Sequence, residues 1–212
     1  MKYLSRICIL FIMVTLISAC ARESNVLLSD DFSGIDNNWD KVSDANMTTD
    51  YFNSAYRILV NMPNYDAWAN PDDLSFSDVQ VEVDASKNGG PDLNDFGVIC
   101  RYTSVDNYYY ATISSDGYYG IYKKTAEGGT QLGQGKEQFS DKILTGAVTN
   151  HIRFDCVGST LSLYVNGTLI DQQTNTAYSE GNIGLLAGTY TQTGTDILFD
   201  NLIVYKPENT TP

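Results

Sequence analysis

The sequence has few positive charges for its size. Its 212 residues include 13 lysines and arginines against 26 aspartates and glutamates, which gives a formal net charge of −13 at pH 7. Residues 1–19 contain Lys2 and Arg6 but no acid, so a chain without them is more negative still. This charge disfavours nucleic acid or an anionic membrane surface as a partner because of Coulomb repulsion. It is compatible with a soluble extracytoplasmic domain or with attraction for divalent cations.

The sequence also lacks a helical pattern, and it has a single histidine. No window shows a convincing apolar stripe at i, i+3 and i+4, so we expect at most a short helix or turn in 136–144. His151 stands at the start of a predicted strand without an obvious serine or cysteine nucleophile, and we interpret it as a solvated or packing residue. No phosphate-binding loop and no zinc-ligand spacing is present. The sequence therefore gives little support for catalysis.

Residues 1–20 resemble the leader of a bacterial lipoprotein. Two basic residues precede the apolar run 7–17, which is short for a membrane span but suits a signal peptide. The run leads into Ser18-Ala19-Cys20, which resembles the lipobox, in which small residues precede a lipid-modified cysteine. This resemblance implies an anchor of more than one acyl chain on Cys20, which suffices for stable attachment to the cell membrane or outer membrane. The alternative is an ordinary signal peptide that happens to end beside a cysteine.

Two of the four cysteines remain after the leader is set aside. Cys8 lies in the leader and Cys20 is the predicted lipid site, which leaves Cys100 and Cys156. Export to an oxidising compartment favours a disulfide between these two residues. Two buried free thiols are the alternative.

The rest of the chain has the pattern of a single all-β domain. Short segments rich in Val, Ile, Tyr and Thr alternate with clusters of Gly, Asn, Asp and Ser. The predicted strands are 28–33, 55–61, 78–84, 95–102, 107–114, 117–123, 150–157, 160–166, 168–173, 182–187 and 196–205. So many strands predict an antiparallel two-sheet sandwich or jelly roll over 28–206, with a tether at 21–27 and a tail at 207–212. Asn166-Gly167 has the residue types of a type I′ hairpin turn.

Four stretches together resemble a known group of proteins. They are DDFSG (30–34) with Trp39 shortly after it, DFGVICRY (95–102), HIRFDCVGSTLSLYVNGTLI (151–170) and ILFDNLIVY (197–205). They resemble the concanavalin A-like jelly roll, in its laminin-G-like and 3-keto-disaccharide-hydrolase-like branch. The resemblance implies this fold over 28–205. It leaves function open, because the group includes sugar-binding modules, glycoside-modifying enzymes and adhesion domains.

The glycosidase pattern of that group is incomplete here. Retaining enzymes on this fold carry E-x-D-x-x-E, with the acids positioned as nucleophile and general acid. Glu82 and Asp84 begin the pattern, but Lys87 occupies the place of the last acid. We therefore interpret these acids as the solvated face of an ordinary strand and predict no catalytic residue.

The same resemblance suggests a structural Ca²⁺ where the first and last strands meet. Asp30 and Asp31 lie on the first predicted strand, and Asp200 lies on the last one beside Asn201. Carboxylate and carbonyl oxygens are the ligands that Ca²⁺ takes. The alternative is that these are turn and edge acids of an acidic protein.

A tyrosine-rich stretch over 106–124 raises the possibility of sugar binding. Alternation places Tyr109 on the core face, with Ala111 and Ile113, and it places Tyr108 and Tyr110 on the opposite face, exposed or half-buried. Aromatic rings suit the flat C–H faces of sugars, whose hydroxyls need polar partners. The alternative is that these tyrosines simply suit a pleated, half-buried surface.

Other residues complete the predicted sugar site. Alternation places Arg101 on the face of Ile99, where it would line one concave surface with the phenol rings if it adjoins Tyr110 across the sheet, and Trp68 is expected on a loop at the rim. The predicted ligand contacts are Trp68, Arg101, Tyr108, Tyr110 and Tyr118. The sequence thus favours a membrane-anchored, non-catalytic glycan-binding or adhesion module with carbohydrate as its partner. A glycoside-modifying hydrolase and a structural envelope lipoprotein with a protein partner are the alternatives.

Overall fold

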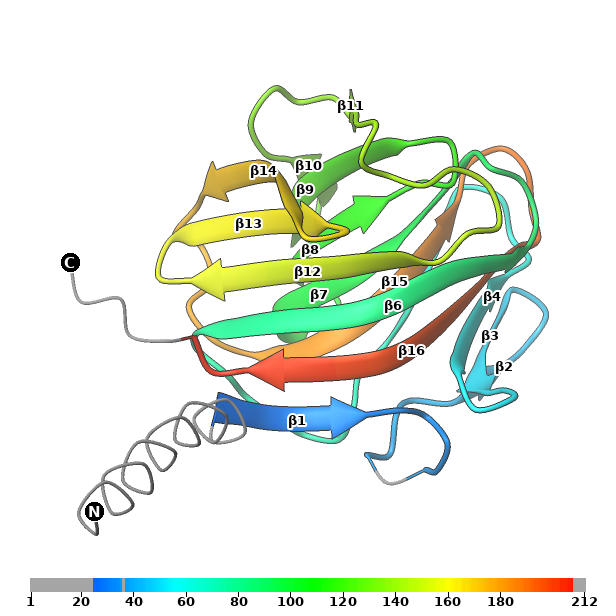
Figure 1. Ribbon diagram of the computed structural model, residues 1–212, viewed down its shortest axis with the longest axis horizontal. Helices are drawn as coiled ribbons and strands as arrows, with labels where there is room; N and C mark the ends of the chain where they lie inside the picture. The colour runs from blue at the N-terminus through cyan, green and yellow to red at the C-terminus, as the bar shows by residue number, and fades with distance from the viewer. Residues whose placement is uncertain (1–24, 36, 208–212) are drawn as a thin grey trace, which may run out of the picture.

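The computed structural model describes residues 25–35 and 37–207, which form a sandwich of two antiparallel β-sheets (Figure 1). No α-helix occurs within these ranges. Accordingly, none of the described residues forms a helix long and apolar enough to cross a membrane. The predicted lipid site Cys20, the rest of the leader and most of the predicted tail lie outside the described residues.

One sheet has nine strands and lies in front in Figure 1. Its strands are β1 (Val26–Asp30), β2 (Val42–Ser43), β3 (Met47–Tyr51), β4 (Tyr56–Val60), β6 (Val79–Gly89), β12 (Asn150–Val157), β13 (Thr160–Val165), β14 (Thr168–Thr174) and β16 (Thr195–Tyr205). Their order is β14-β13-β12-β6-β16-β4-β3-β2, and β1 pairs with the second half of β16.

The other sheet has seven strands and lies behind the first in Figure 1. Its strands are β5 (Tyr65–Ala69), β7 (Asn94–Ser104), β8 (Asn107–Ile113), β9 (Tyr118–Thr125), β10 (Gly128–Gln131), β11 (Gln138–Phe139) and β15 (Asn182–Thr189). Their order is β10-β9-β8-β7-β15-β5, and β11 pairs with β9.

The core lies between the two sheets and follows the predicted alternation. On β6, Val79, Val81 and Val83 are buried in the core, while the polar residues between them remain partly exposed on the outer face. A period of two with one polar face is what a strand covering a core on one side requires. The all-β sandwich predicted from the sequence is confirmed.

A disulfide between Cys100 and Cys156 joins the two sheets. Cys100 lies on β7 and Cys156 on β12, and both side chains are fully buried. The predicted disulfide is therefore confirmed, and it connects residues 56 positions apart.

The first and last strands are neighbours, as predicted. Beside their junction, the carboxylate of Asp30 accepts hydrogen bonds from Phe32 N, from Asn37 Nδ2 and from Trp39 Nε1, at 2.7, 2.8 and 3.0 Å. Trp39 is 2% exposed and packs against Phe32 in the core. Asp30 thus holds the turn after β1 onto the core.

Several strands differ from those predicted. The sequence pattern does not predict β2, β3, β5, β10 and β11, of which three have four residues or fewer. Trp68 is expected on a loop, but it lies on β5, where it alternates with the buried residues Ala67 and Ala69. The predicted hairpin at Asn166-Gly167 is present, and both residues have the positive φ, +50° and +79°, that a type I′ turn requires.

Candidate functional site

The outer face of the seven-stranded sheet carries a second apolar cluster, separate from the core. Tyr108 and Tyr110 of β8 form it together with Ile99 of β7 and Leu186 of β15. Trp68 of β5, Tyr102 of β7 and Tyr122 of β9 pack against it. On β8, Tyr109, Ala111 and Ile113 belong to the core instead. The predicted division of the tyrosines between the two faces is therefore confirmed.

The rings of this outer-face aromatic cluster contact one another in a chain. Tyr110 and Tyr122 are stacked with centroids 4.7 Å apart and an interplanar angle of 9°. Tyr108 lies 5.6 Å from Tyr110, 5.4 Å from Tyr102 and 6.3 Å from Trp68, centroid to centroid. Such distances are typical of favourable ring pairs.

The two predicted tyrosines are more deeply buried than expected. Tyr108 is 1% exposed and Tyr110 is 7% exposed, since neighbouring rings cover them. Burial raises the pKa of both phenols above the ordinary value, so both are neutral at physiological pH. The rings that a ligand can reach are the partly exposed ones, namely Trp68, Tyr102 and Tyr122.

Two carboxylates meet beside this cluster, one on each side of Gly188. Gly188 of β15 pairs with Asp66 of β5 on one side and with Asp95 of β7 on the other. A Cβ atom on Gly188 would lie 2.6 Å from Asp66 Oδ1 and 2.2 Å from Asp95 Oδ1. Because both oxygens lie so close to one point, the distance between Asp66 Oδ1 and Asp95 Oδ1 is at most the sum of these two distances. This arrangement requires glycine between them.

One carboxyl oxygen of Asp95 lacks a hydrogen-bond partner in the described part of the chain. Its Oδ1 is buried and has no hydrogen-bond partner among the described residues. Burial raises its pKa well above the ordinary value, and the neighbouring charge of Asp66 raises it further. Burial also raises the pKa of Asp66. Two like charges at this separation resist ionising together, so the pair tends to retain a proton.

A third acid, Glu137, closes one side of the cluster. It lies in the segment between β10 and β11, and its Oε1 accepts hydrogen bonds from Tyr122 Oη at 3.0 Å and from Tyr190 Oη at 2.6 Å. Tyr190 follows β15 directly. The outer face is thus bounded on one side by this segment.

Arg101 does not lie beside Tyr110, contrary to the prediction. Ile99 pairs with Tyr110, and Arg101 has a left-handed φ of +53° where the β7–β8 register shifts. Its side chain is 2% exposed and donates to the carbonyl oxygens of Ser77 at 3.0 Å and Tyr178 at 2.9 Å. It therefore supports two loops of the fold and is not part of the proposed ligand surface.

Tyr118 lies outside the cluster, although alternation gives it the same face. It is 42% exposed at the start of β9, and its ring contacts Phe139 at 5.7 Å. A contact with ligand at Tyr118 stays a prediction. Six residues of this face are not predicted from the sequence as site residues: Asp66, Asp95, Tyr102, Tyr122, Glu137 and Tyr190.

The three residues predicted to bind calcium do not form a cluster of metal ligands. Asp30 already accepts three hydrogen bonds, and Asp31 Oδ1 accepts two from Ser33. Asp200 accepts the backbone N–H of Asn201. Within residues 25–35 and 37–207, no group of three or more His, Cys, Asp or Glu side chains could hold a metal ion. The calcium site stays a prediction.

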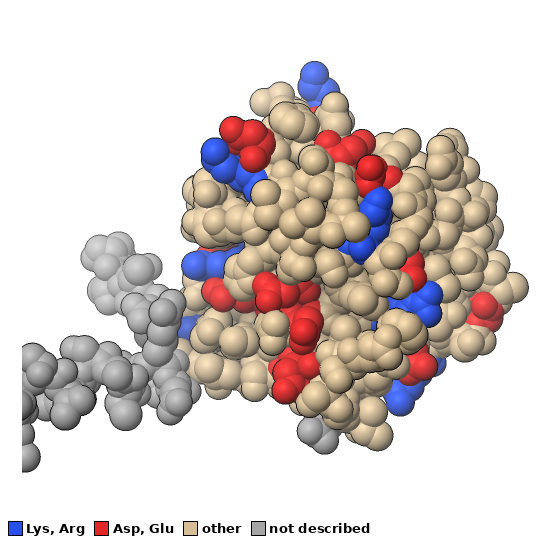
Figure 2. All heavy atoms as spheres, turned by 45° about the vertical axis from the view of Figure 1, so that its right-hand side comes forward, with Lys and Arg blue, Asp and Glu red and all other residues tan. Residues whose placement is uncertain are grey.

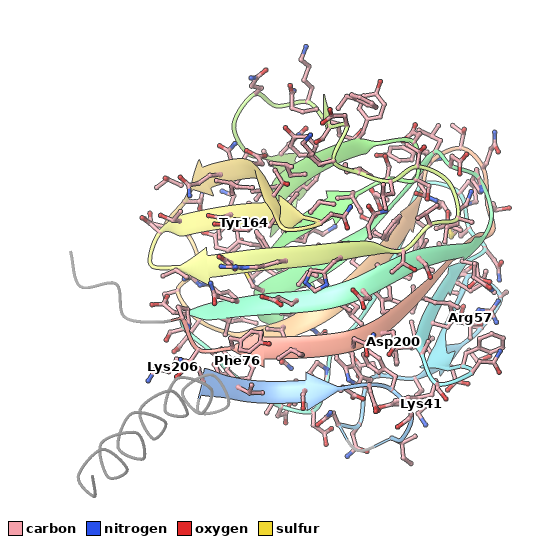
Figure 3. All side chains as sticks on the ribbon, in the orientation of Figure 1. Lys41, Arg57, Phe76, Tyr164, Asp200 and Lys206 are labelled. Carbon is pink, nitrogen blue, oxygen red and sulfur yellow. A yellow bond between two sulfur atoms is a disulfide. The ribbon has the colours of Figure 1, made fainter. Side chains whose placement is uncertain are left out.

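The acids of the incomplete glycosidase pattern lie on the other sheet. On the outer face of the nine-stranded sheet, Glu82 Oε2 is 3.4 Å from His151 Nε2 and Asp84 Oδ1 is 2.8 Å from His151 Nδ1. Lys87, further along β6, forms an ion pair with Asp92. Asp200 lies on β16 of the same sheet (Figure 3), and acidic side chains gather on this side of the molecule (Figure 2).

No family model and no curated protein sequence matches the chain. Solved structures do match it. A carbohydrate-binding module CBM66 from Bacillus subtilis aligns with a TM-score of 0.63 at 16% identity, covering 79% of this chain and 95% of that one. A Bacillus subtilis protein with a galectin-like fold gives 0.63 at 10% identity, covering 85% and 96%.

A β-glucanase from Bacillus licheniformis is also similar, with a TM-score of 0.61 at 13% identity, covering 85% of this chain and 98% of that one. At these identities the likeness establishes the fold alone. The chain therefore has the jelly-roll sandwich fold that these structures share, which is the fold that its sequence motifs predict.

Proposed function

We propose that the protein is a non-catalytic glycan-binding module whose ligand lies on the outer face of the seven-stranded sheet. Trp68, Tyr102 and Tyr122 provide aromatic surface there, and Asp66 and Asp95 provide acceptors for sugar hydroxyls. The observation that carries the proposal is the unpartnered Oδ1 of Asp95 beside this aromatic surface. A buried acceptor without a donor costs free energy, and a ligand hydroxyl would supply that donor.

The fold is compatible with this proposal. A carbohydrate-binding module and a β-glucanase share it, so it is able to present a sugar-binding surface. The acidic surroundings favour neutral sugars, because Glu137 and the charge that remains on the Asp66–Asp95 pair would repel a glycan that carries carboxylates or sulfates.

A glycan-array screen followed by calorimetry tests the proposal. Trp68→Ala and Tyr122→Ala should each weaken binding at least tenfold, since each removes a ring from the ligand surface. Phe52→Ala is the matched control, because it removes an aromatic residue that is 37% exposed beside Arg57, outside this cluster. Equal affinity in all three variants would refute the site, and the absence of any glycan ligand would favour the protein-partner alternative.

Glycoside hydrolysis is the second candidate function, and the carboxyl pair favours it. Retaining glycosidases hold their two carboxyl groups about 5–5.5 Å apart. Asp66 and Asp95 are close enough for such chemistry, and the raised pKa of Asp95 suits a proton donor. Release of reducing ends by the wild type and not by Asp66→Asn would establish an enzyme.

Anchoring through Cys20 and calcium binding are further proposals. Metabolic labelling with a fatty acid should mark the wild type and not Cys20→Ala if the lipobox is functional. Millimolar Ca²⁺ should raise the Tm of the wild type but not that of Asp200→Ala if the predicted calcium site exists. An equal response of the two proteins would exclude the calcium site.

A further inference from the structure

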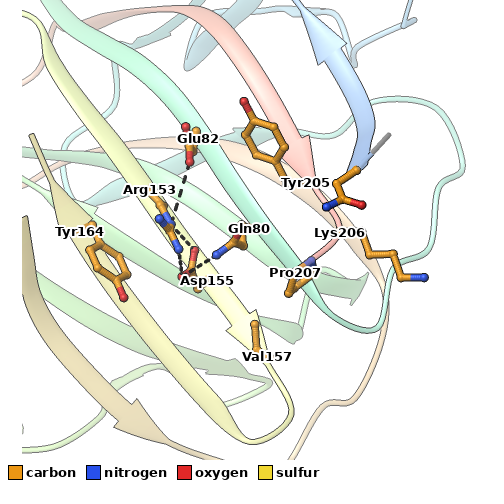
Figure 4. Close-up of a pocket in the computed structure, with 10 residues that line it drawn as sticks. Gln80, Glu82, Arg153, Asp155, Val157, Tyr164, Tyr205, Lys206 and Pro207 are labelled. Carbon is orange, nitrogen blue, oxygen red and sulfur yellow. Dashed lines mark hydrogen bonds and ion pairs between the residues drawn. The ribbon is translucent and has the colours of Figure 1, made fainter. Parts of the chain in front are cut away.

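A groove of about 540 Å³ with mixed polar and apolar walls crosses the outer face of the nine-stranded sheet (Figure 4). Its floor consists of Gln80 and Glu82 of β6 and of Arg153 and Asp155 of β12. A volume of this size is typical of ligand sites. The groove lies on the opposite side of the molecule from the outer-face aromatic cluster, with the hydrophobic core between them.

The floor is held rigidly by its own contacts. Arg153 donates to both oxygens of Asp155, from Nε at 2.7 Å and from Nη2 at 2.6 Å, and Gln80 Nε2 donates to Asp155 Oδ2 at 3.2 Å. The Arg153 guanidinium also lies 4.5 Å from the centroid of the Tyr164 ring. These contacts use only part of the donor capacity of a guanidinium, and they orient it before a ligand arrives.

Tyrosines stand at the two ends of this floor. Tyr164 of β13 pairs with Arg153, while Tyr205 of β16 pairs with Gln80. The strands lie in the order β13-β12-β6-β16, and Arg153 and Gln80 are two residues out of register with each other, so the two tyrosines are about 14 Å apart across the strands and about 7 Å along them, or about 16 Å in all. Figure 4 shows both rings beside the groove with the polar side chains between them. This length suits a chain of sugar units.

The charges of the groove balance. Arg153 and Lys206 oppose Glu82 and Asp155 among the lining residues, whereas the whole chain has a formal net charge of −13. A neutral ligand therefore meets paired donors and acceptors, while an anionic ligand is repelled by the chain as a whole. Aromatic residues at both ends of a polar floor match the C–H faces and hydroxyls of a saccharide.

We propose that this groove is a second glycan-binding site, which takes a neutral oligosaccharide and makes the protein bivalent. The site does not depend on the outer-face aromatic cluster, since no residue of that cluster lines the groove. Two sites on opposite faces would allow one molecule to bridge two glycan chains and would increase the avidity for a polysaccharide.

NMR titration of the full protein with neutral gluco-, xylo- and galacto-oligosaccharides tests the proposal. The Nε–H signal of Arg153 reports on the groove, and the indole N–H of Trp68 reports on the other face. We expect at least one of these sugars to shift the Arg153 signal. Tyr164→Ala/Tyr205→Ala should weaken that response at least tenfold and leave any response of Trp68 unchanged.

Trp68→Ala is the reciprocal control, because it should leave the groove response intact even if the proposal for the other face fails. Arg153→Lys keeps the charge but loses the bidentate fork, and it should also weaken binding in the groove. The indole signal of Trp39, which is buried in the core, verifies that each variant is folded. An unshifted Arg153 signal with all three neutral sugars, or a shift with only acidic ones, would overturn the proposal.

Discussion

The carboxylates of Asp66 and Asp95 converge above the Cα atom of Gly188, each within 2.6 Å of the place that a Cβ atom would occupy there. The three residues come from three adjacent strands, β5, β15 and β7, which the order of the sheet brings together. Two half-buried acids at this separation repel each other when both are ionised, so the pair does not stabilise the sheet.

Asp95→Asn should stabilise the protein at neutral pH. The pKa of Asp95 is raised above 3.8 in the folded state. Below about pH 4 the carboxyl group is protonated in the folded and the unfolded chain, so it costs no stability. As the pH rises, the unfolded chain ionises first, and the free energy of unfolding falls until the pH passes the raised pKa. Removing the charge should therefore gain about 1–3 kcal/mol at pH 7 and little at pH 3.5. Urea unfolding at both pH values measures this difference. A variant that is less stable than the wild type at pH 7 would show that the ionised form is accommodated.

Gly188→Ala should lose stability by about 1–3 kcal/mol, since its new methyl group collides with both carboxylates. The same substitution should cost much less when Asp95 is alanine, because one of the two colliding oxygens is then gone. A double-mutant cycle over Gly188 and Asp95 measures the coupling. Additive effects of the two substitutions would mean that the close approach has no energetic consequence.

Loss of the disulfide between Cys100 and Cys156 should reduce the free energy of unfolding by about 4 kcal/mol. The bond closes a loop between residues 56 positions apart, and the entropy of such a loop in the unfolded chain sets this magnitude. Urea unfolding of Cys100→Ala/Cys156→Ala measures the loss. The wild type unfolded in the presence of reductant separates the effect of the cross-link from that of the lost sulfur atoms. Equal stability with and without reductant would disprove a contribution of the bond.

His151 should titrate with a pKa of about 9. Hydrogen bonding to Glu82 raises the pKa most, and Asp84 raises it further against the opposing effect of burial. The stabilisation from these contacts is complete below about pH 6.5 and is lost as the pH rises through about 9. Since the chain has one histidine, its imidazole NMR signals are unambiguous.

Two variants identify the source of that pKa shift. Glu82→Gln should bring the pKa of His151 closer to its ordinary value, and Asp84→Asn should have a smaller effect. The shorter contact is the one to Asp84, at 2.8 Å against 3.4 Å, so the comparison also tests whether distance alone determines the order. A wild-type pKa near 6.5 would contradict the predicted charge of this group.

Alternation along single strands predicted much of the fold. It placed Tyr109 in the core and Tyr108 with Tyr110 on the opposite face, because successive side chains of a strand point to opposite sides. It failed at Arg101, where the register of β7 against β8 shifts and a left-handed backbone turns the side chain away. Only the pairing of the strands reveals such an irregularity.

The proximity of Asp66 and Asp95 could not be predicted from the sequence, for a different reason. Asp66 and Asp95 meet because β15, which comes much later in the chain, lies between β5 and β7. Nothing in the local pattern specifies that order. A signal for Asp66 is present in the sequence, since Tyr65, Ala67 and Ala69 alternate with Asp66 and Trp68 as the residues of a strand do.

The two tryptophans occupy separate environments, so their intrinsic fluorescence reports on two different regions of the molecule. Trp39 is enclosed by the core and donates to Asp30, whereas Trp68 is partly exposed among the tyrosines of the outer face. Replacing either one with phenylalanine would leave a single tryptophan, whose emission is separated from that of the 15 tyrosines by exciting at wavelengths that tyrosine does not absorb. The fluorescence of Trp39 alone would follow unfolding, and that of Trp68 alone would follow occupancy of the aromatic surface. Folding and binding are thus optically separable without any added label.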